Sequence, residues 1–384
     1  MNAYSIYIHL PYCDAKCPYC DFPSSAVSER RFAEYRQALT AEWEAVQSSY
    51  RQTRPISIYV GGGTPSIWPE RELISLLFAL PISDACEVTV EVNPGSVTPA
   101  WLECIKTAGV NRISVGVQAM DDRRLALLGR RHTAGEAGNA ISVCNTQNFG
   151  SISADIIYGT PGQTPDDLKT ELQLLTGMGV HHISAYELTV SHHTPIGKRV
   201  CEGTFNLPSE STLIALWHTV RNLLSTVGIG QYEVSNYARP GHESRHNRHY
   251  WTGGEYIGLG SGAHGYVRIS DSHCRYANTT DIDAYIDYWT KKDATQNHLE
   301  NPLRTVEYLS LSDLALERVM LGLRTTKGFD FNELLEMIPK SKQERWREIA
   351  TTAASRGLVL FDGAYITPTA DGLLLADAIA EEFF

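Results

Sequence analysis

The sequence lacks several features that would assign it to common classes of protein. It contains no run of eighteen apolar residues, and its first ten residues, MNAYSIYIHL, include neither a basic segment nor a long apolar one. We therefore expect no integral membrane segment, no signal peptide and a cytoplasmic location. The 33 basic residues are outnumbered by 44 acidic ones, which gives a formal net charge of -11. Because phosphate contacts need a local excess of Lys and Arg, this charge argues against nucleic acid as a partner.

Cysteine is sparse and unevenly placed. The 384 residues include 8 cysteines, of which Cys13, Cys17 and Cys20 lie close together while the other five are scattered singly. A reducing compartment argues against a disulfide framework and for metal binding or catalysis. A closed structural metal site usually has four ligands, so this cluster is one ligand short. The isolated cysteines are typical of small buried apolar residues.

Short β-branched runs alternate with helix-like segments over the first two hundred residues, which is the pattern of βα units in a parallel sheet. We predict strands at Ser5–His9, Ile56–Val60, Glu87–Val92, Arg112–Val117, Ile152–Ile157 and His182–Glu187. We predict helices at Glu29–Gln47, Glu70–Phe78, Pro99–Thr107, in two parts over Asp121–Asn145, at Pro165–Thr176 and at Glu210–Val227. Six units are two short of a closed (β/α)8 barrel, so the sequence predicts an α/β fold with a partial (β/α)6 barrel.

Polar or glycine-rich residues follow successive predicted strands at the points where the strands end. They are Gly61 to Thr64, Glu91, Gln118, Asp155 and Glu187. In barrels of parallel strands the active site lies at the C-terminal mouth. We therefore expect these residues to converge on one cavity.

The domain organisation follows from changes in composition. Residues 1–230 form the predicted barrel, and residues 231–300 form a connecting region rich in Gly, His and aromatic residues. Residues 301–384 read as helices, a hairpin with an Asp-Gly turn in LVLFDGAYITPT, and a final helix, which is typical of a winged-helix-like domain. Such domains can bind DNA, but the acidic end favours packing or partner docking.

The spacing C-x3-C-x2-C lets three thiolates face one small volume. Soft thiolate ligands select iron–sulfur clusters or zinc. A [4Fe–4S] cluster held by three cysteines keeps one iron open, and an open metal position can bind a substrate or cofactor. The alternative is zinc with His9 as the fourth ligand, although His9 falls within a predicted strand.

Two glycine-rich stretches resemble nucleotide-binding motifs only in part. GSGAHG, from Gly260 to Gly265, satisfies G-x-G-x-x-G, but it lies outside any βαβ unit, so we predict a turn or a close-packing role. GGGTP lacks the G-K-[ST] ending of a phosphate-binding loop.

The motifs CDAKCPYC and GGGTP resemble those of the radical S-adenosylmethionine (SAM) superfamily. The wider set, YIHLPYCDAKCPYCDF, GGGTPS, EVNPG, SVGVQ, LGRRH and ADIIYGTPGQT, resembles the branch that contains oxygen-independent coproporphyrinogen III dehydrogenases and HemW heme chaperones. The resemblance covers essentially the whole chain. It implies that Cys13, Cys17 and Cys20 hold a [4Fe–4S] cluster and that SAM chelates the open iron. In this superfamily the reduced cluster cleaves SAM to methionine and a 5′-deoxyadenosyl radical, and the protein contributes orientation and exclusion of water.

The resemblance also implies contacts to SAM. Tyr19 would flank the adenine, Tyr7 and Glu91 would contact SAM, the backbone of Gly62, Gly63 and Thr64 would approach its amino end, and Gln118, Arg130 and Asp155 would make the remaining polar contacts. Glycine permits close backbone approach, and a carboxylate near a ribose can accept hydrogen bonds from its hydroxyls. No catalytic residue is assigned.

Two features separate the members of this branch. The dehydrogenases carry a further cysteine two residues after the third, where this chain has Phe22. HNRHYW, from His246 to Trp251, matches the H-N-x-x-Y-W motif of HemW-like proteins, which is associated with heme binding, so His246 is a candidate heme ligand. Without the resemblance, histidines in this basic stretch, which we expect to be a loop, are better explained as solvated or hydrogen-bonded groups than as metal ligands.

Three hypotheses follow. The first is a radical SAM protein with a [4Fe–4S] cluster that binds heme and transfers it to acceptor proteins, including respiratory ones. The second is an oxygen-independent coproporphyrinogen III dehydrogenase, an activity that Phe22 argues against, so enzymatic activity stays open. The third is a zinc-stabilised winged-helix binding protein with a degenerate barrel, which the intact cysteine triad opposes.

Overall fold

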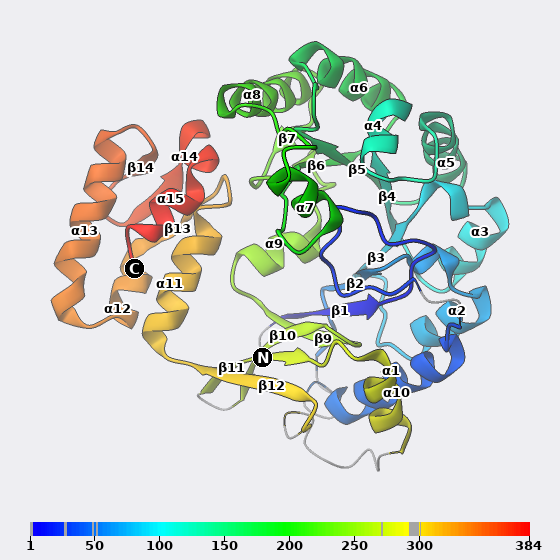
Figure 1. The fold of residues 1–384 in the computed structure, drawn as a ribbon. Coiled ribbons are helices and arrows are strands. Elements are labelled where there is room, and N and C mark those ends of the chain that lie inside the picture. The colour runs from blue at the N-terminus through cyan, green and yellow to red at the C-terminus, as the bar shows by residue number, and fades with distance from the viewer. Residues whose placement is uncertain are drawn as a thin grey trace.

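The computed structural model describes residues 3–26, 29–47, 50, 53–269, 272–291, 299 and 301–384. A curved sheet of six parallel strands forms its centre (Figure 1). The strands are β1 (Tyr4–Leu10), β2 (Ser57–Gly62), β3 (Glu87–Val92), β4 (Arg112–Gln118), β5 (Ser151–Tyr158) and β6 (His182–Glu187). They are hydrogen-bonded in chain order. All six predicted strands are therefore present; β3 and β6 have the predicted bounds, and the ends of the other four differ by at most two residues.

Helices follow the strands and cover the outside of the sheet (Figure 1). They are α1 (Phe32–Gln47), α2 (Glu70–Phe78), α3 (Pro99–Thr107), α4 (Asp122–Leu127), α5 (Ala134–Thr146), α6 (Pro165–Gly177) and α8 (Glu210–Thr226), with the short 3-10 helices η2 (Pro65–Ile67) and η3 (Pro94–Ser96). Capping boxes at Thr133 and Thr164 fix where α5 and α6 begin. The prediction missed α7 (Pro195–Cys201), which is too short to show a helical period.

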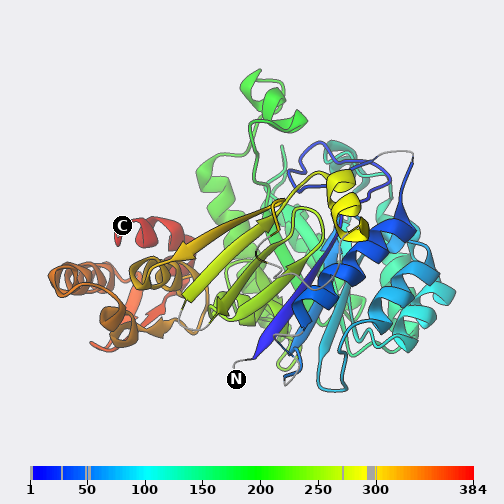
Figure 2. The same ribbon diagram turned by 90° about the horizontal axis from the view of Figure 1, so that it is seen from below.

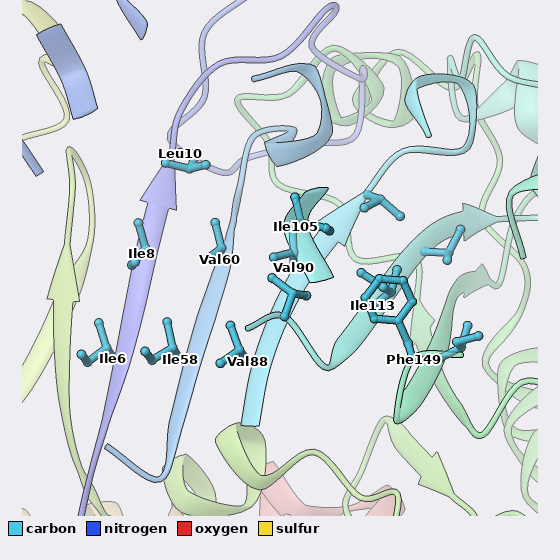
Figure 3. Close-up of a cluster of buried hydrophobic side chains, with 14 of the residues drawn as sticks. Ile6, Ile8, Leu10, Ile58, Val60, Val88, Val90, Ile105, Ile113 and Phe149 are labelled. Carbon is cyan, nitrogen blue, oxygen red and sulfur yellow. The ribbon is translucent and has the colours of Figure 1, made fainter. Parts of the chain in front are cut away.

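The two faces of the sheet differ in character. Apolar side chains such as Ile6, Ile8 and Val60 form the core against the helices (Figure 3). Since successive side chains on a strand point to opposite faces, the residues between them face the inside of the barrel. Many of these are polar, including Tyr59 and Ser114. The alternation therefore gives the barrel a polar interior beneath its C-terminal mouth.

The sheet continues beyond both ends of the parallel core. β9 (Glu255–Leu259) runs parallel to β1, and β10 (His264–Ile269), β11 (Ser272–Asn278) and β12 (Arg304–Leu309) extend this edge with antiparallel pairing. At the other edge, β8 (Asn236–Ala238) pairs with β6, and β7 (Gly230–Gln231) pairs with β8. The sheet has 12 strands and does not close. The segment predicted to connect two domains thus supplies strands to both edges.

The stretch after β8 forms a helix, not the predicted loop. α9 (Arg245–Trp251) is capped by Ser244, whose hydroxyl accepts a hydrogen bond from Asn247 N. α10 (Ile282–Lys291) packs against α1 near the other edge of the sheet. The GSGAHG stretch is the turn between β9 and β10, where a Cβ on Gly260 would lie 2.5 Å from the His9 carbonyl oxygen, so this glycine has the predicted close-packing role.

The C-terminal residues form a separate layer beside the sheet (Figure 2). It consists of α11 (Leu311–Gly322), β13 (Phe329–Asp330), α12 (Phe331–Met337), α13 (Lys340–Ser355), β14 (Val359–Phe361), β15 (Tyr365–Pro368), α14 (Ala370–Leu374) and α15 (Ala376–Glu381). Phe331, Trp346 and Phe383 lie at the centre of its own core. The three strands form a small sheet that includes the predicted Asp-Gly hairpin. No helix among the described residues is long and apolar enough to cross a membrane.

Candidate functional site

The three clustered cysteines lie on the loop that follows β1 and face one cavity of about 400 Å³. The loop holds its own shape, because Cys13 N donates to Ser25 O (2.9 Å), Ser25 N to Pro11 O (2.8 Å) and Cys20 N to Cys17 O (3.1 Å). All three thiols are free and partly exposed. A preformed loop therefore brings the cysteines to the mouth of the barrel.

The strand ends supply the other walls of this cavity. Of the residues predicted to bind the cluster or SAM, the following line it: Cys13, Cys17, Cys20, Tyr19, Gly62, Gly63, Thr64, Glu91, Gln118, Arg130 and Asp155. Phe22 and Glu187 also line it. The expected convergence of the strand-end residues on one cavity is confirmed except for Gly61, which does not line it.

Tyr7 does not line the cavity. Its hydroxyl is 3.0 Å from Nδ1 of His9, and burial raises its pKa. His9 in turn places Nε2 2.7 Å from the carbonyl oxygen of Pro23, so both of its ring nitrogens have partners. His9 is therefore unsuited to be a zinc ligand. Among the described residues, no three His, Cys, Asp or Glu side chains are grouped around a single metal ion such as zinc.

The glycines after β2 allow the backbone to approach the cysteine loop. Gly62 has φ of 108°, and a Cβ there would lie 2.6 Å from the ring of His9. A Cβ on Gly63 would lie 2.6 Å from the carbonyl oxygen of Tyr12. Gly63 N donates to Leu10 O (2.7 Å) and Thr64 N to Tyr12 O (2.9 Å). Larger residues would therefore push these two segments apart.

Two carboxylates occupy the floor of the cavity. Glu91 accepts hydrogen bonds from Tyr59 Oη (2.8 Å) and Gly62 N (3.3 Å). Burial, aided by the negative charge of Asp155, raises the pKa of Glu91 to about 7. Asp155 accepts hydrogen bonds from the Ser114 hydroxyl (2.8 and 3.0 Å), and burial raises its pKa as well. Both groups are therefore suited to meet polar hydrogens or positive charge on a ligand.

Arg130 links Asn93, which follows β3, to the cysteine loop. Its Nη2 donates to Asn93 Oδ1 (2.7 Å) and to Gly116 O (3.2 Å), and its Nη1 lies 3.5 Å from the sulfur of Cys17. Asn93 Nδ2 donates to Thr64 Oγ1 (3.1 Å). The guanidinium thus places a positive charge beside a thiol that must be a thiolate to bind iron.

Gln118 reaches the cavity through an irregular backbone. It has φ of 64°, and the register between β4 and β5 shifts between Val115 and Gln118. Such a bulge redirects a side chain at the end of a strand. The local distortion therefore turns Gln118 towards the cavity.

Sequence reasoning missed several residues of the site. Asn93 and Ser114 line the cavity, and Asn93 directly follows a predicted strand in EVNPG, which is the signal that applied to its neighbours. α7 and the stretch before it also support the cysteine loop, because Ile196 N donates to Pro18 O (3.0 Å) and the Ser191 hydroxyl donates to Asp21 (2.7 Å). No local pattern in the sequence indicates that second contact.

His246 lies outside this cavity. It is 8% exposed on α9, with Nδ1 3.0 Å from the Ser57 hydroxyl and its ring centroid 5.1 Å from that of Tyr59. Burial lowers its pKa to about 3. Tyr59 also donates to Glu91, so His246 packs beneath the floor of the cavity.

The residues present fit a [4Fe–4S] cluster and SAM. Three thiols face an open volume beside the guanidinium of Arg130. Both ring nitrogens of the nearby His9 already have hydrogen-bond partners. The adjoining walls offer an aromatic ring at Tyr19, glycine backbone and two carboxylates. This set of groups suits a cofactor with an aromatic base, hydroxyls and an amino end.

Comparisons with known proteins agree with this arrangement. Residues 7–175 match the family model of the radical SAM superfamily, and residues 309–375 match the HemN C-terminal domain. The chain is 34% identical to the heme chaperone HemW of Mycobacterium tuberculosis (strain CDC 1551 / Oshkosh), covering 98% of this chain and 93% of that protein. It is 31% identical to the heme chaperone HemW of Bacillus subtilis (strain 168), covering 99% and 98%.

Among solved structures, the fold is similar to coproporphyrinogen III oxidase (HemN) from Escherichia coli, with a TM-score of 0.78, 21% identity, and coverage of 100% of this chain and 90% of that one. This likeness bears on the fold alone. The similarity over nearly the whole length at more than 30% identity, together with the radical SAM match over the cysteine loop and strand ends, identifies the family. The chain belongs to the HemW family of the radical SAM superfamily.

Proposed function

We propose that this protein binds heme and transfers it to acceptor proteins, and that it carries a [4Fe–4S] cluster and SAM. The observation that carries the proposal is the similarity over nearly the whole chain to proteins named heme chaperone HemW. The cysteine loop and the cavity beside it support the cofactor part. We expect the acceptors to include respiratory heme proteins and the location to be the cytoplasm, where the eight free cysteines stay reduced.

In this proposal Cys13, Cys17 and Cys20 hold the cluster, which when bound supplies the electron that cleaves SAM. The guanidinium of Arg130 places a positive charge beside the sulfur of Cys17 and fixes Asn93 at the cavity wall. Tyr19 lines the cavity and would exclude water from the adenine.

The remaining predicted contacts orient SAM. The backbone of Gly62 to Thr64 presents polar groups without side-chain bulk, and Glu91, Gln118 and Asp155 offer hydrogen-bond partners from three different strands. A raised pKa lets Glu91 donate or accept a hydrogen bond near neutral pH. Tyr7 would influence SAM binding only indirectly, because it contacts His9 and does not line the cavity.

A second candidate function is oxidative decarboxylation of coproporphyrinogen III, which the likeness of the fold to HemN favours. Phe22 argues against it. Its side chain is 61% exposed and lines the cavity at the position where the dehydrogenases carry a fourth cysteine. A phenyl ring there can supply neither a thiolate nor a proton. We therefore favour the heme chaperone.

Heme transfer is the direct test of the proposal. The anaerobically reconstituted protein is loaded with heme, freed of excess heme by gel filtration, and mixed with a heme-free acceptor whose Soret band differs. We expect stoichiometric binding followed by movement of heme to the acceptor. Absence of saturable binding, or heme that never leaves the loaded protein, would rule out a chaperone role.

A further inference from the structure

A second cavity lies between the sheet and the C-terminal layer, away from the cysteine loop. Its volume is about 200 Å³. A row of side chains forms its floor, because Tyr256, Tyr266 and Arg275 are direct cross-strand partners on β9, β10 and β11. Directly opposed residues point to the same face of a sheet. The three side chains therefore present one continuous surface.

One face of α11 forms the opposite wall. Leu314, Glu317, Arg318 and Leu321 all line the cavity, and their spacing places them on one side of a helix. The turn after α9 closes one end, where Gly253 has φ of 71° and lies against the side chain of Arg318. Sheet, helix and turn thus enclose a defined site.

One aromatic residue of this cavity comes from the H-N-x-x-Y-W segment. Tyr250 in that segment lines the cavity with a 40% exposed side chain, and its ring centroid is 4.7 Å from that of Tyr256. Tyr256 Oη donates to Tyr250 Oη (3.3 Å). A planar apolar ligand could therefore lie against these rings.

A tyrosine with a histidine partner lies at the buried end. Tyr266 is 9% exposed, and its hydroxyl is 2.7 Å from Nδ1 of His273. Tyrosine ligates heme iron as the phenolate, and a neighbouring imidazole can accept the proton that the phenol loses. The two residues lie on neighbouring strands, and the antiparallel pairing of β10 with β11 brings them together.

Two arginines border the same cavity. Arg275 pairs with Glu307 (3.3 Å) and Glu317, and Arg318 pairs with Glu333. These are partly exposed ion pairs, which contribute little to stability and can exchange partners at small cost. Guanidinium groups bind carboxylates through paired hydrogen bonds, so heme propionates are suitable replacements.

We propose that this cavity is the heme site, that the phenolate of Tyr266 ligates ferric heme iron, and that Arg275 and Arg318 pair with the propionates. The inference rests on the proposed heme-binding function and assigns its location. On ligation the bond from Tyr266 Oη to iron forms, the phenol O–H bond breaks, and the proton passes to Nδ1 of His273 and on to solvent. Iron keeps its oxidation state. The cavity is smaller than the roughly 300–1,000 Å³ of pockets that enclose a ligand, so it covers only the face of the macrocycle that bears the bond to Tyr266, and the other face stays accessible to an acceptor.

His246 is the alternative ligand from the same segment. In the observed conformation its ring is held between Ser57 and Tyr59 under the cofactor cavity, and it does not line the second cavity. Ligation by His246 would require these contacts to break. The two ligand assignments therefore predict different variants to fail.

The test is a titration of full-length reconstituted protein with ferric heme, recorded as difference absorption against the same protein without heme. We expect Tyr266→Phe to lose the phenolate-to-iron charge-transfer band and to weaken heme binding by roughly tenfold or more. The matched control Tyr308→Phe removes a hydroxyl from a 70% exposed ring on β12 and should leave the spectrum and the affinity unchanged. His246→Gln should retain the charge-transfer band.

A second arm tests the arginines with heme dimethyl ester, which lacks free carboxylates. Arg318→Gln should weaken binding of heme by roughly tenfold and leave binding of the diester unchanged. If wild-type protein binds no heme, the proposed function fails. If it binds heme but Tyr266→Phe keeps the band, or His246→Gln alone loses it, the function stands and this site is wrong.

Discussion

At the scale of single residues, Cys17 is the cysteine that contacts Arg130, with 3.5 Å between its sulfur and Nη1. A serine hydroxyl stays protonated at neutral pH and is a harder ligand than a thiolate. We expect Cys17→Ser to reduce the iron and sulfide of reconstituted protein to background and to remove its brown absorbance. Cys201→Ser changes an exposed cysteine at the end of α7 and should retain both. Full iron and sulfide in Cys17→Ser would contradict the ligand assignment.

Glu91 gives a second residue-scale prediction, on the dependence of stability on pH. Burial raises its pKa from 4.5 to about 7, so between these values the folded state holds a proton that the unfolded state has released. Stability therefore falls as pH rises through this window and is lowest above pH 7. Glu91→Gln keeps an acceptor for Tyr59 but carries no charge.

In cofactor-free protein we expect Glu91→Gln to raise the free energy of unfolding by about 1–3 kcal/mol at pH 8 and to change it little at pH 5. Urea unfolding at the two pH values measures the difference. Glu171 and Glu233, whose pKa values burial also raises to about 7, are the same in both proteins and cancel. An equal effect at both pH values would show that Glu91 does not titrate in this window.

Most residues of the cavity at the cysteine loop were predictable because they follow a strand, and parallel strands bring their carboxyl ends to one edge. Asn93 carries the same signal. Tyr7 and His246 show the limit of this reasoning. Whether a side chain faces a cavity or packs beneath it depends on neighbours such as His9, Ser57 and Tyr59, which come from other strands.

At the scale of elements, a buried ion pair fixes the outer strands to the helices. Arg304 on β12 pairs with Glu42 on α1, and both side chains are fully buried. Glu42 also accepts hydrogen bonds from Tyr285 Oη (2.6 Å) and Gly260 N (2.8 Å). The pair therefore connects α1, α10, β12 and the turn after β9.

We expect Arg304→Gln to lower the free energy of unfolding by about 3–5 kcal/mol, because it leaves a buried carboxylate without its cation. Arg356→Gln is the matched control, since Arg356 pairs with Glu382 at the surface and should cost less than about 1 kcal/mol. Denaturant midpoints of the two variants give the comparison. Equal losses would mean that the buried pair does not hold this edge of the sheet.

The parallel strands and their helices were predictable because their signals are local: β-branched runs, helical periods and caps such as Thr133 and Thr164. β9 to β12 were not, because they gain their partners across long stretches of sequence, as when β9 pairs with β1. α9 was predicted as a loop because its seven residues are mostly polar and give no apolar stripe. Its cap at Ser244 is a signal that the prediction did not use.

At the scale of the whole molecule, the C-terminal layer attaches to the stretch just after β7. Val234 N donates to Arg324 O (2.9 Å), Thr326 N donates to Tyr232 O (3.1 Å), and Glu233 forms a β-bridge with Thr325. Its winged-helix-like elements were predictable, but this attachment was not, because it joins segments that no sequence pattern relates. α11 lies beside the outer strands of the sheet (Figure 1). Residues of α11 and of β9 to β11 line the cavity at Tyr266.

The central claim is that the protein binds and transfers heme and does not decarboxylate coproporphyrinogen III. Two assays on the same reconstituted sample test this claim. One is titration with ferric heme, and the other is incubation with coproporphyrinogen III, SAM and a reductant. We predict saturable heme binding with the coproporphyrinogen III left unconverted, because Phe22 stands where the dehydrogenases carry a cysteine. Accumulation of protoporphyrinogen IX at catalytic rates would contradict the account.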